Sequence, residues 1–174
     1  MKRPVVFRAV SVLTLALGLA ACKAGPVDTS RAGFKANYLV ARVALETGQY
    51  EKATRHYASL LRTSGPLEPR LRLEYAHALL REGKYDKAAD EAGEVAGQLS
   101  GAGRSAALAV VGTARHEAAR VAIRKGRTGL AEVNLLKSAR AALREMMARN
   151  PELDTTGGMA ARLADIDIEL QAIL

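Results

Sequence analysis

Cys22 is the residue whose type and position most directly suggest chemistry, because it is the only cysteine in the 174-residue chain. It follows Leu19-Ala20-Ala21 at the end of an apolar stretch. A lone thiol cannot form a disulfide within its own chain, so its position calls for another explanation.

The residues before Cys22 are typical of a secretory signal peptide. A basic n-region is followed by a short apolar stretch over residues 10–20 and by small residues at the cleavage edge. The basic residues are Lys2, Arg3 and Arg8. A membrane-spanning helix would need about 20 uninterrupted apolar residues, which Arg8 and Lys23 exclude. We therefore predict a signal peptide over residues 1–21 and a polar tether over residues 22–33.

The run Leu19-Ala20-Ala21-Cys22 resembles a bacterial lipobox, in which the cysteine receives a diacylglycerol and becomes the new N-terminus. The resemblance implies a lipid anchor on Cys22, held in the membrane by about 0.8 kcal/mol for each buried CH₂ group. By the same resemblance, Lys23 in place of an aspartate implies an outer membrane location that faces the periplasm. An ordinary signal peptide with an incidental cysteine is the alternative.

The rest of the chain offers few groups for catalysis. The three histidines, His56, His77 and His116, lack the spacing to other ligands that a metal site needs. His116-Glu117 begins like a zinc-protease motif, but Arg120 stands where the second histidine would be. The sequence also lacks a Gly-x-Ser-x-Gly elbow and a phosphate-binding Gly-Lys-Thr/Ser loop. We expect a protein that is not an enzyme and holds no metal or cofactor.

Composition favours one helical domain with a basic surface. Removal of residues 1–21 leaves about 150 residues, which suits a single core. The chain is rich in alanine and leucine and contains no tryptophan. Its formal net charge is +8, of which Lys2, Arg3 and Arg8 supply three charges. A secreted basic protein is expected to meet acidic proteins or anionic headgroups, and nucleic acid is not an expected partner.

The sequence contains an internal repeat. Gly48-Gln49-Tyr50-Glu51-Lys52-Ala53 recurs as Gly83-Lys84-Tyr85-Asp86-Lys87-Ala88, and each copy lies between two stretches with helical periodicity. We predict that Gly48 and Gly83 end helices with left-handed backbone angles. The apolar residues expected to face the core before the two glycines are Leu39, Val40, Val43 and Ala44, and then Leu73, Ala76, Leu79 and Leu80.

These units resemble the tetratricopeptide repeat, a helix-turn-helix unit of about 34 residues. The residues that carry the resemblance are Gly48, Tyr50, Ala53 and Tyr57 in the first unit and Gly83, Tyr85 and Ala88 in the second. The chain departs from the pattern at Asn37 and Arg72, where a large aromatic side chain is usual. The resemblance implies an all-α solenoid over residues 34–174, with two clear repeats.

A third, degenerate unit is expected over residues 106–149. One helix would end before Gly126, the next would run over residues 130–149, and Asn150-Pro151 would stop it. Ala131, Leu135 and Ala139 are expected to supply its contact face. The final segment reads as a capping helix with its polar side at Asp165 and Glu169. Its apolar stripe comprises Met159, Leu163, Ile166, Leu170 and Ile173. A helix that binds a partner is the alternative.

In a stacked array, equivalent positions of the first helices would line one concave groove. The side chains at these positions are mostly basic: Lys35, Tyr38, Arg42, Arg70, His77, Arg81, His116, Arg120 and Arg124. Arginine binds carboxylates through two parallel charge-assisted bonds, so the expected ligand is an acidic peptide segment. The alternative is a solvated charged face with no ligand.

An anchor followed by a short repeat array resembles the pilotins and the tight-adherence pilus assembly lipoproteins. The resemblance implies a membrane-anchored scaffold that binds another envelope protein while a pilus or secretion system assembles. An adaptor or regulator of peptidoglycan-active enzymes is one alternative, and a catalytic lipoprotein is another. The sequence leaves the oligomeric state open.

Overall fold

The computed structural model describes residues 31–174, so Cys22, the signal peptide and most of the tether lie outside the described part. The described residues are all-helical, which confirms the all-α prediction. The α-helices are α1 (Arg31–Glu46), α2 (Tyr50–Leu61), α3 (Glu68–Glu82), α4 (Tyr85–Gln98), α5 (Gly101–Arg124), α6 (Leu130–Arg149) and α7 (Gly158–Ile173), with short 3-10 turns at Gly65–Leu67 and Pro151–Leu153. Among residues 31–174, none of the helices is both long enough and apolar enough to cross a membrane.

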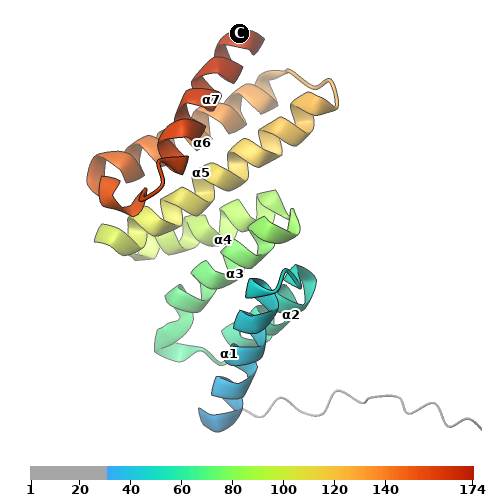
Figure 1. The fold of residues 1–174 in the computed structure, drawn as a ribbon, viewed down its shortest axis with the longest axis vertical. Coiled ribbons are helices and arrows are strands. Elements are labelled where there is room, and N and C mark those ends of the chain that lie inside the picture. Colours follow the sequence, from blue (N-terminus) through green and yellow to red (C-terminus); the bar gives the residue numbers. More distant parts are fainter. Residues whose placement is uncertain (1–30) are drawn as a thin grey trace, which may run out of the picture.

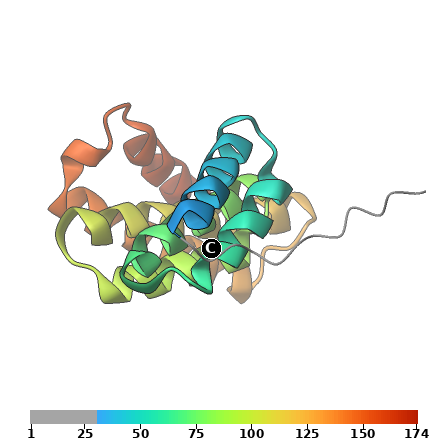
Figure 2. The same ribbon diagram turned by 90° about the horizontal axis from the view of Figure 1, so that it is seen from below.

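The helices form a row in chain order. Each helix packs against the next, and the row runs along the long axis from α1 at one end to α7 at the other (Figure 1). Helix α3 also contacts α5, and α5 contacts α7. Figure 2 views the row from the α1 end. The odd-numbered helices therefore share one side of the molecule, which is where the sequence placed the groove.

The three predicted turns close in the same way. The φ angles of Gly48, Gly83 and Gly126 are +77°, +83° and +75°, in the left-handed region that glycine reaches without a Cβ clash. In each turn the amide that follows the glycine donates back across the helix end to a carbonyl. These bonds are Gln49 N to Ala44 O (2.8 Å), Lys84 N to Leu79 O (2.9 Å) and Arg127 N to Ala122 O (3.1 Å). The prediction that Gly48 and Gly83 end helices is confirmed.

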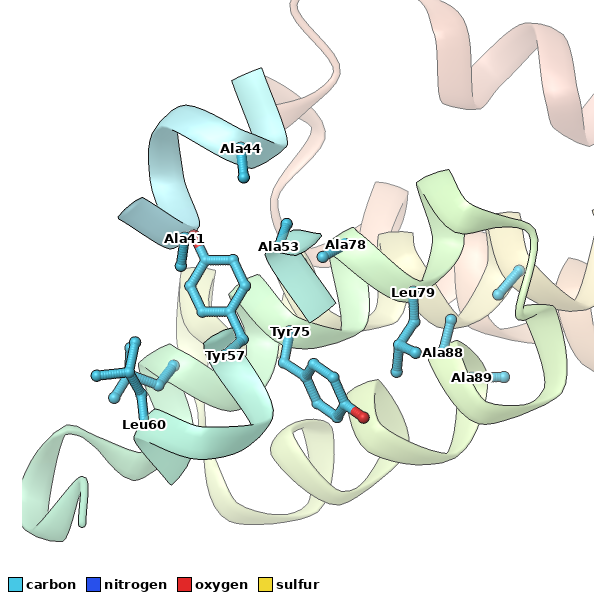
Figure 3. Packing of buried hydrophobic residues seen from close by; sticks show 12 residues of the cluster. Ala41, Ala44, Ala53, Tyr57, Leu60, Tyr75, Ala78, Leu79, Ala88 and Ala89 are labelled. Atoms are coloured by element: carbon cyan, nitrogen blue, oxygen red, sulfur yellow. The ribbon is translucent and has the colours of Figure 1, made fainter. Parts of the chain in front are cut away.

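Alanine residues form much of the contact between paired helices. Ala53 and Ala88, which lie five residues after Gly48 and Gly83, are fully buried. The Tyr57 ring points at Ala41 of α1 (Figure 3). Small side chains at these positions allow the helix axes to approach closely. The buried residues form three adjoining clusters, one around α1 to α4, one around α3 to α6 and one around α5 to α7.

Helix α1 shows the largest departure from the predicted core. Leu39, Val40 and Val43 were expected to face inward, but their exposed fractions are 51%, 38% and 55%. The inward face is instead formed by Ala41 and Ala44, with Phe34, Tyr38 and Leu45 packed against the same cluster. Both faces of this helix are apolar, so periodicity alone could not decide which one is buried.

Four smaller differences concern the connections, the third unit and the cap. Helix α1 begins at Arg31, so the last residues assigned to the tether are helical, and α5 begins at Gly101, directly after a two-residue link. Ala131 is exposed, while Ala139 is buried as predicted. In α7, Ile166 and Leu170 are buried as expected, but Glu169 turns toward α5.

Candidate functional site

A cavity of about 490 Å³ opens between α3, α5 and α7. Its apolar lining consists of Leu80, Ala109, Val110 and Met159, and its polar lining consists of His77, Arg81, Tyr85, Thr113, Glu117 and Arg162. The elements come together here because α5 packs against both α3 and α7. We call this cavity the central groove.

Two of the predicted groove residues line the central groove on the α3 side. Arg81 donates through Nη2 to the hydroxyl of Tyr50 at 2.6 Å, and its guanidinium lies 5.1 Å from the centre of the Tyr50 ring. This contact holds a cation at the edge of the groove through a hydrogen bond and a cation–π interaction. The side chain of His77 is exposed, but its position in the lining of the groove reduces the hydration of its ring. Reduced hydration, with the positive charges of Arg81 and Arg42, lowers the pKa of His77.

The opposite wall carries an ion pair that the sequence analysis missed. Arg162 of α7 donates to Glu117 Oε1 of α5 at 2.8 Å. Burial by itself would raise the pKa of Glu117, but the hydrogen bond and charge of Arg162 outweigh it and lower that pKa. The sequence predicted that the last segment forms a capping helix, but it did not predict how that helix is oriented against α5. The contact between Arg162 and Glu117 was therefore not expected.

Three further predicted groove residues gather at one carboxylate. Tyr38 and Tyr57 donate to the two oxygens of Glu74 at 3.0 and 2.9 Å. Arg42 and Arg70 lie 3.7 and 3.6 Å from the same carboxylate. Burial and the hydrogen bond to Glu74 raise the pKa of both tyrosines. Tyr38, Arg42 and Arg70 therefore have an internal partner that joins α1, α2 and α3.

His116 does not line an open groove, and its assignment to one is wrong. Its side chain is fully buried, because α7 packs over this part of α5. Nε2 lies 2.9 Å from Glu169 Oε2, and Nδ1 lies 2.9 Å from Arg162 Nη1. Arginine can only donate, so Nδ1 accepts and Nε2–H donates to Glu169. Arg120 lies 3.5 Å from the other Glu169 oxygen.

The remaining two predicted residues, Lys35 and Arg124, belong neither to the central groove nor to these clusters. Lys35 lines a separate cavity of about 210 Å³ at the α1 end, together with Phe34, Tyr38, Leu67, Arg70 and Leu71. Arg124 is exposed at the last position of α5. The structure thus divides the predicted groove into a central part around His77 and Arg81, a Glu74 cluster, a His116 cluster and two separate positions, Lys35 and Arg124.

The central groove combines charged side chains with an apolar surface. Its polar groups are two arginines, one histidine, one carboxylate and two hydroxyls above an apolar floor, an arrangement that can hold an amphipathic peptide segment. Within residues 31–174, there is no cluster of three or more His, Cys, Asp or Glu side chains placed to hold a metal ion.

Comparison of the chain with protein-family models, with curated proteins and with solved structures gives no match in any of the three.

Proposed function

We propose that this protein is a tetratricopeptide-like scaffold that binds a segment of another protein in the central groove. The repeated turns support the tetratricopeptide assignment. A Cβ atom built on Gly48 or on Gly83 would lie 3.9 Å from the hydroxyl of the tyrosine two residues later, Tyr50 or Tyr85. The same local packing at both copies is what a structural repeat would produce.

The observation that carries the proposal is the pairing of cations with an apolar floor in one cavity. Arg81 of α3 and Arg162 of α7 line the same cavity as Leu80, Val110 and Met159. An amphipathic segment could bury apolar side chains on this floor while its carboxylates accept hydrogen bonds from the arginines. The expected ligand is therefore an acidic segment with apolar residues at helical or extended spacing.

The proposed location follows from Cys22. A lipid on this residue would hold the helical domain close to the outer membrane, with the central groove open to the periplasm. The partner would then be an envelope protein, and we propose a component of a pilus or secretion system. A regulator of peptidoglycan-active enzymes is the competing assignment, and the same experiment distinguishes them by what is captured.

The test is photo-cross-linking in the native host with the full-length chain. A photoreactive residue at Thr113 in the groove should capture an acidic envelope protein, whereas one at Arg55, an exposed position on α2, should not. Mass spectrometry identifies the captured protein. Capture of pilus or secretion components supports the assembly role, and capture of cell-wall enzymes supports the competing one. Equal capture from both positions would contradict binding in the groove.

Two variants sharpen the test. Arg81→Gln should reduce capture severalfold and make it less sensitive to salt, because one charge-assisted contact is lost. Arg55→Gln is the matched control, since Arg55 pairs with Glu51 on the α2 surface and lies outside the groove lining. Cys22→Ser tests the anchor separately, because it should release the protein from the membrane without altering the groove.

A further inference from the structure

An apolar stripe covers the outward face of α1 at the end of the row of helices. It consists of Ala36, Leu39, Val40 and Val43, and all four side chains are exposed. Their spacing of three and four residues places them on one side of the helix. Single exposed aliphatic residues are common on protein surfaces, but four adjoining ones on one helix are not. We call this surface the outer α1 stripe.

The opposite face of α1 is already occupied. Ala41 and Ala44 are buried against α2 and α3, with Phe34, Tyr38 and Leu45 packed beside them. A helix that is apolar on both faces belongs in an interior, and the end unit of a repeat array needs a polar outer face to remain soluble. Because α1 is the terminal helix of the described row, the outer α1 stripe is left exposed by the other described helices (Figure 1).

We propose that a second copy of this chain covers the stripe, in an antiparallel α1–α1 pair related by a two-fold axis close to Val40. A two-fold interface uses the same patch on both subunits, which requires a self-complementary surface. In the antiparallel arrangement Leu39 of one copy faces the valines of the other. Ala36 lies at the N-terminal end of the stripe, where its small side chain permits close approach of the two helices.

The charges beside the stripe select this orientation. Lys35 and Glu46 are eleven residues apart, so both lie along the same edge of the helix, about 16 Å from each other. An antiparallel pair places each Lys35 opposite Glu46 of the second copy, on the same edge of both helices. A parallel two-fold pair would place the charged edges of the two copies on opposite sides of the pair, so Lys35 and Glu46 would not meet. The side chain of Glu46 is 60% exposed, although one of its oxygens accepts a hydrogen bond from Arg42.

Other occupants fit less well. A helix that lies on anionic lipid carries several free Lys or Arg residues beside its apolar face. This edge carries Lys35, Arg42 and Glu46, and Arg42 is already paired with Glu46 and lies 3.7 Å from Glu74. Residues 22–30 contain one large aliphatic side chain, Val27, and therefore offer little apolar surface. The inference concerns a different surface from the central groove and does not depend on the proposed function.

The first test is disulfide cross-linking of the full-length chain in an oxidising compartment of intact cells. Val40→Cys should give a dimer on a non-reducing gel that disappears on reduction, because the two Val40 positions lie near the two-fold axis. Ile168→Cys on α7 is the matched control, since Ile168 is 65% exposed and lies outside the stripe. The parent chain without an added cysteine measures any cross-link through Cys22.

The second test measures the molar mass of the purified full-length protein by light scattering over a range of concentrations. Leu39→Glu with Val43→Glu should weaken the dimer by more than about tenfold, because burial would place unpaired carboxylates in an apolar interface. Helicity should be unchanged, since both residues are exposed, and Ile168→Glu should leave the mass unchanged. Lys35→Glu should weaken the dimer, and adding Glu46→Lys should restore most of the loss.

A monomeric mass at every concentration, with no Val40→Cys cross-link, would overturn the proposal. Stripe-dependent binding of the monomer to phospholipid vesicles would also overturn it, because a bilayer would then cover the stripe. Neither the cross-linking test nor the molar-mass test depends on whether Arg81→Gln reduces partner capture. The dimer and the proposed groove function can therefore fail separately.

Discussion

Glu74 joins the first three helices through one carboxylate. Its oxygens accept hydrogen bonds from Tyr38 of α1 and Tyr57 of α2, and the Tyr57 side chain is fully buried. A buried hydroxyl that loses its acceptor carries the full cost of its desolvation. The sequence analysis assigned Tyr38 to partner binding, but its hydroxyl is engaged within the protein.

Replacing Glu74 should therefore destabilise the α1 end. We expect Glu74→Ala to lower the free energy of unfolding by about 1–3 kcal/mol, because the Tyr57 hydroxyl loses its acceptor in the interior. Glu74→Gln keeps one acceptor oxygen and should cost less. Denaturant unfolding followed by circular dichroism measures both. Equal losses in the two variants would show that the hydrogen bond to Tyr57 is not the main contribution.

The surroundings of His116 predict a pH dependence of stability. Burial lowers its pKa, while the hydrogen bond to Glu169 opposes this shift and the charges of Arg162 and Arg120 reinforce it. The hydrogen bonds of His116 also favour the neutral ring. Arg162 donates to Nδ1, so a proton on Nδ1 would place two donors against each other. Glu117, which pairs with Arg162, is the remaining charged group of this cluster.

The sign of the pH effect follows from the lowered pKa. The unfolded chain takes up a proton near pH 6.5, before folded His116 does, so acid stabilises the unfolded state. We expect the free energy of unfolding to be highest above this pH and to fall as the pH drops toward the lower, folded-state pKa. His56 and His77 also have lowered pKa values and add to the same trend.

The variant His116→Gln isolates the contribution of His116. A glutamine can donate to Glu169 and accept from Arg162 without titrating, so stability should depend less on pH below about 6.5. Thermal unfolding at several pH values measures the difference in slope. Glu117 acts in a lower window, because its lowered pKa adds stability that is lost only as carboxylates protonate. An unchanged slope would assign the effect to the other histidines.

At the scale of elements, Gly112 permits close packing of α5 against α6. A Cβ atom on Gly112 would lie 2.5 Å from Leu143 Cγ and 3.1 Å from the Ala139 carbonyl oxygen. Both distances are too short, and the carbonyl belongs to the backbone of α6. Glycine at this position is therefore required by packing, despite its low helix propensity.

Gly112→Ala should destabilise the protein, because overpacking costs about 1–3 kcal/mol and exceeds the gain of up to about 1 kcal/mol in helix propensity. Gly97→Ala in α4 is the matched control, since no atom lies within 4 Å of its Cβ position. That change should stabilise the protein slightly. Chemical denaturation of both variants gives the comparison, and stabilisation by both would mean that α5 and α6 can separate at little cost.

Sequence patterns predicted the boundaries of several elements. Helix α6 runs over Leu130–Arg149 as expected, because Pro151 excludes helix at the preceding residue and Gly126 ends α5 through a local turn. The outward rotation of α1 was not predictable in this way. Leu39 and Val43 form as good an apolar stripe as Tyr38, Ala41 and Leu45, and only contact with α2 and α3 selects between them.

At the scale of the whole molecule, the core is a row of three clusters, and each cluster is formed mainly by helices that are neighbours in the row. Ile166 belongs to the cluster around α5, α6 and α7, whereas Leu60 belongs to the cluster around α1 to α4. In such a row each unit depends mainly on its neighbours, so local stability can differ from one end to the other.

Substitutions at the two ends should therefore act locally. Ile166→Ala should cost about 2–5 kcal/mol and speed amide hydrogen exchange in α6 and α7 more than in α1 and α2. Leu60→Ala should give the opposite distribution. Exchange followed by mass spectrometry of peptides resolves the two ends. An equal increase along the whole row would show instead that the helices unfold as one cooperative unit.

The sequence by itself determined the features that depend on near neighbours in the chain. The helical content, the turns at Gly48, Gly83 and Gly126 and the end of α6 at Pro151 all follow from local backbone preferences and from periodicity. The proposed lipid site at Cys22 likewise depends on a short segment, although it lies outside the described residues.

Only the tertiary structure decided which charged side chains face a partner and which face each other. His116, Arg120 and Arg162 meet Glu169 or Glu117 because α7 folds back onto α5 across more than forty residues of chain. Tyr38 and Arg42 meet Glu74 because α1 packs beside α3. Charge pairing over such distances depends on the rotation of each helix about its axis. That rotation is set by the packing of alanine and leucine side chains between helices, and local sequence patterns do not specify it.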